Sequence, residues 1–517
     1  MGKLSTLFTL VLLYCSATLQ KVPYGQNLIV LLIDGLGSSQ LNQSNFELLG
    51  FRHLRESGAH AEYVKPTYPT QSYPNWMSLF SGLYAENHGF TADYMWDVKT
   101  GTGFHKGEQP NDTAHFWWSD RPAPLWYTAG KARVDVHCYW IAGCHTTKRS
   151  AFARNCLFYD ERPIYHKQHL KREKVILIFS TTRLKNMHNE ASVVPYVDLI
   201  VQVPLSRKYN ASFSEQTESL PTHFPEIVER ITKYQAYKQQ LYLIRYGGVE
   251  STLRLFGSQS HEGRQAISRA DLYLHDLQQK LEERGLFEST NLVVISDHGL
   301  HPVDSEEQFY IEECLADFSK ITKIVNSHSM MMVFTSPDEL DEVFFELKVC
   351  DQWAPMGDYD DGDNPLVSVY RTSELPEKFH WKRSRFMPGI VIMTRPGATV
   401  LTRELPSIPV SDEHARDIRQ TGGWDNDIPE MRGIFIARGP AFKRNQQSPP
   451  INMVDVYQVL LNILGIEPPH RHNGSWSNVE DLLSSGWESR TSPESISSSS
   501  SVTQAFFCLI LLCFLYP

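Results

Sequence analysis

Short apolar runs that alternate with stretches of helical spacing constrain this chain more than any other feature. Strands that are buried on both faces of a sheet read as continuous apolar runs, and helices that cover such a sheet read with a period near 3.6. The alternation therefore predicts an α/β fold with a mostly parallel sheet and helices on both faces. The apolar runs are 28–33, 197–203, 241–244, 292–295, 330–334 and 434–437, and the clearest helical stretches are 266–283 and 454–464.

Charge and composition exclude several classes of protein. The chain has 517 residues, of which 41% are hydrophobic and 21% are charged, as in a globular protein. It carries 49 basic against 59 acidic residues, so it has no excess of positive charge with which to neutralise a nucleic-acid polymer. A specific site for a small anion remains open.

The two ends of the chain predict an extracellular protein. Residues 1–20 contain one lysine, an apolar stretch and then small residues, which is typical of a secretory signal peptide, although a short buried strand would read similarly. Residues 481–504 form a Ser-rich spacer, and residues 505–517 form an apolar tail that is too short for a membrane span of ~20 residues. This layout indicates a GPI-attachment signal, with a single-span anchor or an apolar tail as alternatives. We expect one domain at 24–480, a lipid anchor on the extracellular face of the plasma membrane, or otherwise secretion.

Glycosylation sequons and cysteines fit that location. Removing both terminal segments leaves an odd number of cysteines, so one thiol should remain unpaired or pair between chains. The sequons begin at Asn42, Asn111, Asn210 and Asn473, and the remaining cysteines are Cys138, Cys144, Cys156, Cys314 and Cys350.

Acidic side chains follow two of the predicted strands. The run at 28–33 leads into Asp34, and the run at 292–295 leads into Ser296, Asp297 and His298. Functional groups of open parallel sheets collect beyond the carboxyl ends of strands. Carboxylate and imidazole together suit zinc or a similar divalent ion, whereas a single Asp at such a place is often only a helix N-cap. We interpret the two strand ends as candidate metal ligands.

The segment 69–76, which reads PTQSYPNW, places a serine at a predicted helix start. Pro74 fits the first turn of a helix that continues into apolar residues, so Ser72 lies near the helix N-terminus. Backbone N–H groups there can hold an anion and lower the cost of an alkoxide. Alternatively, Ser72 only caps the helix.

Taken together, these residues resemble the nucleotide pyrophosphatase/phosphodiesterase family of the alkaline-phosphatase superfamily. The resemblance covers about residues 27–479, and the Ser-Tyr pair at 72–73 looks most like the choline-specific glycerophosphodiester phosphodiesterase branch. It implies an alkaline-phosphatase-like α/β fold and a disulfide between Cys144 and Cys156. It rests on the Ser72 segment and on LIDG at 32–35, SGLY at 81–84, HG at 88–89, YMWD at 94–97, SDHG at 296–299, DN at 425–426, MRGIF at 431–435, GP at 439–440, VDVY at 454–457 and NGSWS at 473–477.

The resemblance implies a site with two zinc ions about 4 Å apart, which hold a hydroxyl nucleophile and the phosphoryl group. For one ion the family ligands are all present as Asp34, Ser72, Asp297 and His298, with Ser72 as the nucleophile. Water would then release a phospho-enzyme. A small phosphodiester or choline-type compound is the implied ligand.

The second zinc position departs from the family pattern. Its three ligands would be Glu250, Arg254 and Gly422. Glu250 could bind a metal, but Arg254 has no lone pair and Gly422 has no side chain. Asp93 stands where the family has a phosphate-contacting Asn. We therefore expect one zinc ion at most.

Two functions follow from this degenerate site. The first is an impaired or inactive phosphodiesterase relative, a pseudoenzyme that acts in binding. The second is an active zinc-dependent ecto-phosphodiesterase that cleaves choline head-group lipids or nucleotides through a phospho-enzyme on Ser72. For the degenerate half we predict an ion pair between Arg254 and Asp93. We also predict that the substitutions Glu250→Asp, Arg254→His, Gly422→His and Asp93→Asn together rebuild the two-metal site.

Overall fold

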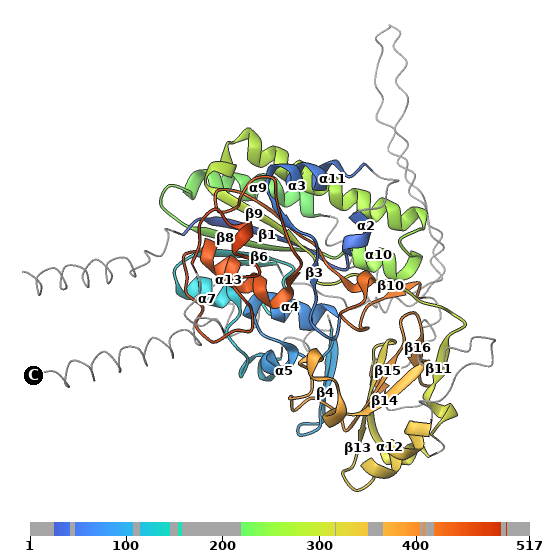
Figure 1. Ribbon diagram of the computed structural model, residues 1–517. Coiled ribbons are helices and arrows are strands. Elements are labelled where there is room, and N and C mark those ends of the chain that lie inside the picture. The colour runs from blue at the N-terminus through green and yellow to red at the C-terminus, as the bar shows by residue number, and fades with distance from the viewer. Residues whose placement is uncertain are drawn as a thin grey trace, which may run out of the picture.

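A central sheet organises the molecule, as the computed structural model shows (Figure 1). The structure describes residues 25–41, 47–106, 114–144, 153–157, 219–315, 317–349, 365–403, 407–408, 418–487 and 493. Within these ranges the central sheet has eight strands. In spatial order they are β20 (Gln446–Ser448), β2 (Ala59–Ala61), β19 (Phe435–Arg438), β9 (Thr290–Ile295), β1 (Asn27–Ile33), β8 (Gln240–Tyr246), β6 (Asp135–Tyr139) and β7 (Ala153–Leu157).

The middle of this sheet is parallel, as the alternating pattern predicted. Strand β1 pairs in parallel with β8 on one side and with β9 on the other, and β6 continues the parallel order beyond β8. Strand β19 is antiparallel to β9 and to β2. The three strands β8, β1 and β9 are therefore neighbours, and their carboxyl ends meet at one edge of the sheet.

Helices cover both faces of the sheet, because alternate side chains of each strand point to opposite faces. On one face, Leu28, Val30 and Leu32 of β1 pack in a core with α4 (Ser72–Ser81), α7 (Leu125–Lys131) and α13 (Met453–Ile463). On the other face, Ile29, Leu31 and Ile33 pack with four further helices. These are α3 (Leu49–Ser57), α9 (Leu220–Tyr234), α10 (Gly248–Phe256) and α11 (His261–Glu283).

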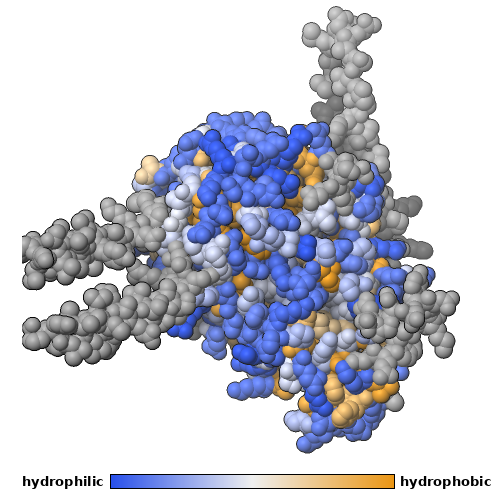
Figure 2. All heavy atoms as spheres, in the orientation of Figure 1, coloured by the Kyte–Doolittle hydropathy of each residue, from blue (hydrophilic) through white to orange (hydrophobic). Residues whose placement is uncertain are grey.

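A second, mostly antiparallel sheet forms a smaller lobe below the first in Figure 1. The apolar run at 330–334 lies here, rather than in the central parallel sheet. Figure 2 shows apolar side chains gathered on this lobe, where Phe345 and Val349 are exposed at the end of α12 (Leu340–Lys348). Its strands in spatial order are β14 (Val367–Arg371), β15 (Ile390–Thr394), β13 (Met330–Thr335), β12 (Ile321–Asn326) and β17 (Ser407–Ile408).

Several short elements complete the described part of the chain. The strand pairs are β4 (Tyr94–Asp97) with β5 (Thr102–His105), β10 (His301–Pro302) with β18 (Gln420–Thr421), β11 (Gln308–Tyr310) with β16 (Thr399–Leu401), and β21 (Ile451–Asn452) with β3 (Val64–Lys65). The short helices are α2 (Ser38–Leu41), α5 (Ala85–His88) and α6 (His115–Trp118).

The disulfide between Cys144 and Cys156 is present and joins β7 to the loop after β6. Cys138 is a buried free thiol, so it is a candidate for the unpaired cysteine that the odd count predicted. Among the predicted glycosylation sites, Asn473 is exposed. Asn42, Asn111 and Asn210 lie outside the described residues.

Most of the terminal segments also fall outside the described residues. This group comprises the predicted signal peptide at 1–20, the tail at 505–517, the apolar run at 197–203 and nearly all of the part of the spacer that follows Trp487. None of the helices in the described residues has the length and apolar character needed to cross a membrane.

Candidate active site

The carboxyl ends of β1 and β9 bring together the acidic residues that the sequence placed there. Asp34 follows β1 directly, and Asp297 and His298 follow β9 after Ser296. The backbone N–H of Gly35 donates to Asp297 Oδ1 at 3.0 Å, which ties the two strand ends together. Gly35 has φ of +70°, and an added Cβ would lie 2.8 Å from Glu250 Cβ, so only glycine fits this turn.

Ser72 is the first residue of α4, whose ten residues are all buried. The N-cap position belongs to Gln71, one residue earlier, so Ser72 does not occupy it. The capping role that remained open from the sequence therefore does not apply. The Ser72 hydroxyl instead points toward the ends of β1 and β9, where it donates to Asp34 Oδ1 at 3.3 Å.

Asp34, Ser72, Asp297 and His298 converge as the sequence predicted. His298 Nε2 lies 3.4 Å from Ser72 Oγ, 3.9 Å from Asp34 Oδ1 and 3.8 Å from Asp297 Oδ2. Ligands held about 2 Å from a tetrahedral metal lie roughly 3.3 Å apart. The distances from His298 Nε2 are thus near those of ligands that share one ion, although the ligand atoms that lie within 4.8 Å of one another belong to Asp34, Glu250 and His298 rather than to Asp297.

The tautomer of His298 also suits metal binding. Its Nδ1 lies 2.8 Å from the carbonyl oxygen of Gly299, which can only accept a hydrogen bond. Nδ1 must therefore carry a proton, so the lone pair of the neutral ring is on Nε2, which faces Ser72 and both carboxylates. A fixed outer hydrogen bond of this kind is the usual support of a metal-binding histidine.

Buried positive charge already stabilises one of the carboxylates. The Arg245 guanidinium donates to Asp34 Oδ2 at 2.9 Å through Nε, and both side chains are buried. Burial acts to raise the pKa of Asp34, but Arg245 and then Lys106 outweigh it and hold this pKa below its ordinary value. Burial and the negative charge of Asp34 raise the pKa of Asp297. The indole N–H of Trp76 donates to Asp297 Oδ2 at 2.6 Å.

The second half of the predicted site contains a lysine that the motifs did not reveal. Lys106 Nζ lies 3.3 Å from Glu250 Oε2 and 2.8 Å from Ser72 Oγ, and its side chain is only 8% exposed. Arg254 lies on the other oxygen of Glu250, at 3.5 Å. One oxygen of Glu250 remains close to the first half, since carboxylate oxygens of Asp34 and Glu250 and a nitrogen of His298 lie within 4.8 Å of one another.

The predicted ion pair between Arg254 and Asp93 is wrong. Asp93 pairs with Lys106 at 3.2 Å, and Arg254 pairs with Glu250 one helical turn before it. The other oxygen of Asp93 accepts the backbone N–H of Tyr73, at the start of α4, at 2.8 Å. The family resemblance placed Asp93 near Ser72, as the structure does. It did not identify Lys106 as the cation that pairs with Asp93.

Gly422 is packed too tightly for the predicted restoration. A Cβ at this position would lie 2.4 Å from the carbonyl oxygen of Thr70 and 3.2 Å from His298 Nδ1. Gly422→His would therefore displace backbone or the retained histidine. The four substitutions derived from the family pattern would not rebuild the second metal position in this chain, because they also leave Lys106 in place.

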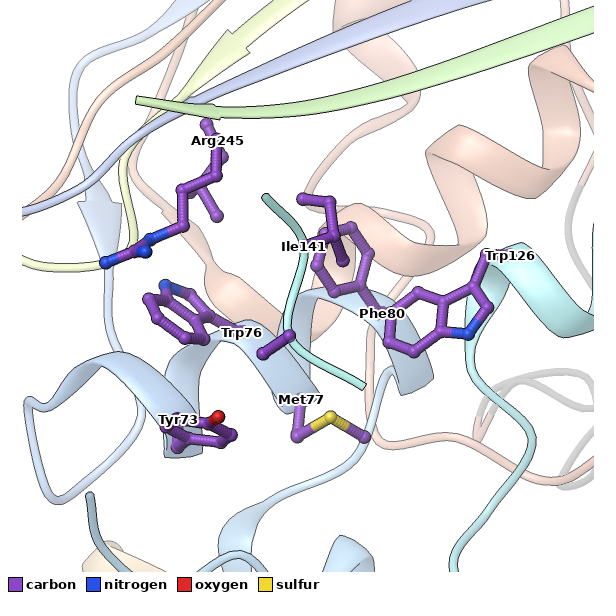
Figure 3. Close-up of a pocket in the computed structure, with 9 residues that line it drawn as sticks. Tyr73, Trp76, Met77, Phe80, Trp126, Ile141 and Arg245 are labelled. Atoms are coloured by element: carbon purple, nitrogen blue, oxygen red, sulfur yellow. The ribbon is translucent and has the colours of Figure 1, made fainter. Parts of the chain in front are cut away.

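A small cavity lies behind α4, on the core side of Ser72. Figure 3 shows Arg245 reaching from β8 to the Trp76 ring, with Tyr73 and Met77 of the same helix below that ring and Phe80 to its right, between Ile141 and Trp126. The guanidinium carbon lies 4.2 Å from the centre of that ring. Apart from Arg245, the cavity is lined by apolar and aromatic side chains, so it is a gap in the core and offers no place for a phosphate.

Some residues of the site carried only a weak signal in the sequence. Arg245 stands out as a charged residue at the end of an apolar strand, and Trp76 follows Ser72 by one helical turn, on the same face. Lys106 follows β5 with no pattern that distinguishes it from a surface lysine. A charged residue in a buried strand is thus the signal that could have revealed Arg245, one of the two buried cations of the site.

The fold and the site together define a class of protein. The α/β sheet presents a buried serine at a helix N-terminus. Next to it lie an Asp from one strand end and an Asp-His pair from the end of the neighbouring strand. This arrangement is the framework of a metal-assisted phosphoryl-transfer protein. The sequence pattern of the family described as type I phosphodiesterase/nucleotide pyrophosphatase matches residues 28–425. The chain belongs to this family.

Individual relatives agree with the assignment. Bis(5'-adenosyl)-triphosphatase ENPP4 of Bos taurus is 24% identical over 463 residues, covering 89% of this chain and 82% of the relative. Ectonucleotide pyrophosphatase/phosphodiesterase family member 5 of Homo sapiens is 23% identical over 480 residues, covering 92% of this chain and 82% of the relative. The choline-specific branch expected from residues 72–73 stays a prediction.

Solved structures show the same fold. Human ectonucleotide pyrophosphatase/phosphodiesterase 5 superposes with a TM-score of 0.68 at 23% identity, covering 89% of this chain and all of that chain (100%). An inactive variant of the murine protein in complex with AMP gives a TM-score of 0.65 at 23% identity, with the same coverage. The mixed α/β architecture predicted from the sequence is therefore confirmed.

Proposed function

We propose that this protein is a catalytically impaired member of the family that acts in binding at the cell surface or after secretion. Its ligand would be a small phosphodiester, a choline-type head group or a nucleotide. An inactive variant of a murine relative was solved in complex with AMP, which supports a nucleotide as one class of ligand. The retained half of the site supplies a place for one metal, and the other half supports loss of catalysis.

The single observation that carries this proposal is the position of the Asp93 carboxylate. It accepts the Tyr73 N–H at 2.8 Å and lies 3.2 Å from Lys106 Nζ, immediately beside Ser72. A phosphoryl group on its way to Ser72 needs such donors for its own oxygens. The Asp93 carboxylate in that place accepts the hydrogen bonds that a phosphoryl group would need, and its charge repels an anion. We expect it to weaken phosphoryl transfer to Ser72 while a ligand can still bind more loosely beside the site.

Metal chemistry would be limited to the retained half-site. Asp34, Ser72, Asp297 and His298 would hold one ion, which would supply positive charge beside Ser72 Oγ. In the second half Arg254 has no lone pair and Gly422 has no side chain. Losing one metal removes several kcal/mol of transition-state stabilisation, and each ~1.4 kcal/mol lowers the rate tenfold.

An active phosphodiesterase is the second candidate, because the retained residues keep their mutual geometry. Ser72 Oγ lies within 3.5 Å of Asp34, His298 and Lys106, and the last of these could stabilise a developing alkoxide. In this case Ser72 would form the phospho-enzyme of the family, with nucleotides or choline head-group lipids as substrates.

Location is part of the proposal. The terminal segments support a secreted precursor with a GPI-attachment signal, and the exposed Asn473 supports a glycoprotein. Release of the protein from cells by a phosphatidylinositol-specific phospholipase would test the lipid anchor. Protein that stays on the cell would favour a single-span anchor.

A hydrolysis assay tests the function. The wild-type chain, supplied with zinc, is assayed on p-nitrophenyl phosphocholine and on bis(5'-adenosyl) triphosphate. We expect its kcat/KM to be roughly 1000-fold or more below that of bovine ENPP4 on the better substrate of ENPP4. This factor corresponds to a loss of about 4 kcal/mol of transition-state stabilisation. Ser72→Ala should lower this residual rate further, because it removes the hydroxyl at the nucleophile position. A rate near that of ENPP4 that disappears in Ser72→Ala would contradict the proposal and establish the active enzyme.

A further inference from the structure

A buried ammonium group occupies the centre of the second half of the site. Lys106 follows directly after β5, and its backbone N–H donates to the Asp93 carbonyl at 3.1 Å. Its Nζ then lies 2.8 Å from Ser72 Oγ, 3.2 Å from Asp93 Oδ2 and 3.3 Å from Glu250 Oε2. Oxygen atoms from α4, from the residue before β4 and from α10 thus surround one positive charge.

Those oxygens would repel one another without a cation. Asp93, Glu250 and Asp34 are buried carboxylates within one small volume, and a buried unpaired charge is costly. Arg245 is committed to Asp34 Oδ2, and Arg254 reaches only the outer oxygen of Glu250. Lys106 is the group that contacts both Glu250 and Asp93 while also contacting the nucleophile position.

We propose that the ammonium of Lys106 replaces the second metal ion of the family site and keeps that ion out. It binds the carboxylate of Glu250, which stands at one of the three ligand positions of this half, and it also contacts a second carboxylate beside the helix N-terminus and the Ser72 hydroxyl. This inference rests on the proposed function for the identity of the site, and it explains how the fold tolerates the loss of the metal ligands.

Removing the ammonium should therefore create a metal site. In Lys106→Ala the carboxylates of Glu250 and Asp93 lose their shared cation, and the shortened side chain leaves room for an ion with water ligands. Carboxylate and water ligands suit Mn²⁺. We expect the full-length Lys106→Ala chain to bind one more Mn²⁺ per chain than the wild type, counted by titration with electron paramagnetic resonance of free Mn²⁺.

Three variants control this measurement. Lys106→Arg keeps the positive charge and should bind the same number of ions as the wild type. Glu250→Gln in the Lys106→Ala background should abolish the extra ion. Lys378→Ala is the matched control, because Lys378 also bridges two carboxylates, Asp425 at 2.7 Å and Asp427 at 2.8 Å, but at a site where its side chain is 49% exposed. It should add no bound ion.

Stability gives an independent readout. Lys106→Ala should melt at a lower temperature than the wild type in EDTA, and Mn²⁺ should raise its melting temperature more than that of the wild type. If Lys106→Ala does not fold, Lys106→Gln, which keeps a hydrogen-bond donor without the charge, takes its place in both measurements.

An unchanged ion count in the folded variant, with no added stabilisation by Mn²⁺, would overturn the inference. That outcome is separate from a failure of the proposed function, which is decided by hydrolysis in the wild type. An inactive wild type with no gain of metal in the variant would leave the proposed function standing and remove only the role of Lys106.

Discussion

At the residue scale, the environment of Ser72 is a balance of buried charges from several elements. Carboxylates of Asp34, Asp93 and Glu250 face the cations of Lys106 and Arg245, and all five side chains are buried. In such a cluster the removal of one charged partner lowers stability by more than the ion pair itself contributes, because the remaining charge is left buried and unsolvated. Each member therefore stabilises the fold as well as the site.

The pair of Arg245 and Asp34 allows a direct test of this balance. Arg245→Met should lower the free energy of unfolding by ~3–5 kcal/mol in EDTA, because it leaves Asp34 buried without its partner. The matched control is Arg52→Met, which removes an exposed partner of Glu47 and should cost at most ~1 kcal/mol. Urea denaturation measures both. Equal effects of the two substitutions would show that Asp34 does not depend on Arg245.

The sequence predicted the ligands of the retained half-site better than their surroundings. Asp34, Asp297 and His298 follow apolar strands, so their meeting place follows from strand adjacency alone. Lys106 and Arg245 act through long side chains whose direction depends on tertiary packing. Their partners could not be read from spacing, and the pairing expected for Arg254 was wrong for the same reason.

At the element scale, α4 is the structural base of the site. It lies wholly in the core, and α5 is fixed against it through His88. The His88 ring accepts the Phe90 N–H at Nδ1, at 3.1 Å, and its Nε2 lies 3.1 Å from the Pro74 carbonyl. Both ring nitrogens are therefore used by the neutral form, and a second proton would break the contact with Phe90.

Stability should depend on pH through His88. Burial, and then the charge of Arg121, lower the pKa of His88 to about 3, from 6.5. In the folded state His88 resists protonation, so neutral His88 contributes fully to the free energy of unfolding above pH 6.5. This contribution is lost as pH falls from 6.5 toward 3, at up to ~1.4 kcal/mol per pH unit. His88→Gln should make this part of the stability profile shallower in urea denaturation between pH 6.5 and 4.5.

His261→Gln is the control for that measurement, because His261 is exposed at the start of α11. Its profile should follow the wild type across the same pH range. If the two glutamine variants give the same slope, His88 does not control the acid sensitivity of α4 and α5.

At the scale of the whole molecule, the sequence predicted the central sheet and missed the division into two lobes. Continuous apolar runs identify β1, β8 and β9 as buried on both faces, and helical spacing identifies α11 and α13. The run that forms β13 reads in the same way but belongs to the smaller antiparallel sheet. An apolar run reports burial, and only the connections between strands decide which sheet a strand joins.

The site depends on chain segments far apart in the sequence, since residues 34, 72, 106 and 298 meet there. Gly422 packs against Thr70 and His298, and β18 just before it pairs with β10. This packing leaves no room for an imidazole at 422. The proposed loss of the second metal position therefore draws support from the packing around Gly422 as well as from the residue types at the three ligand positions.

The number of zinc ions bound to the purified full-length chain tests this loss most directly. After dialysis against zinc and removal of weakly bound metal, mass spectrometry of the metal should find one zinc per chain at most, and His298→Ala should remove it. Two tightly bound zinc ions per wild-type chain would contradict the loss of the second site and would restore the interpretation as an active two-metal phosphodiesterase.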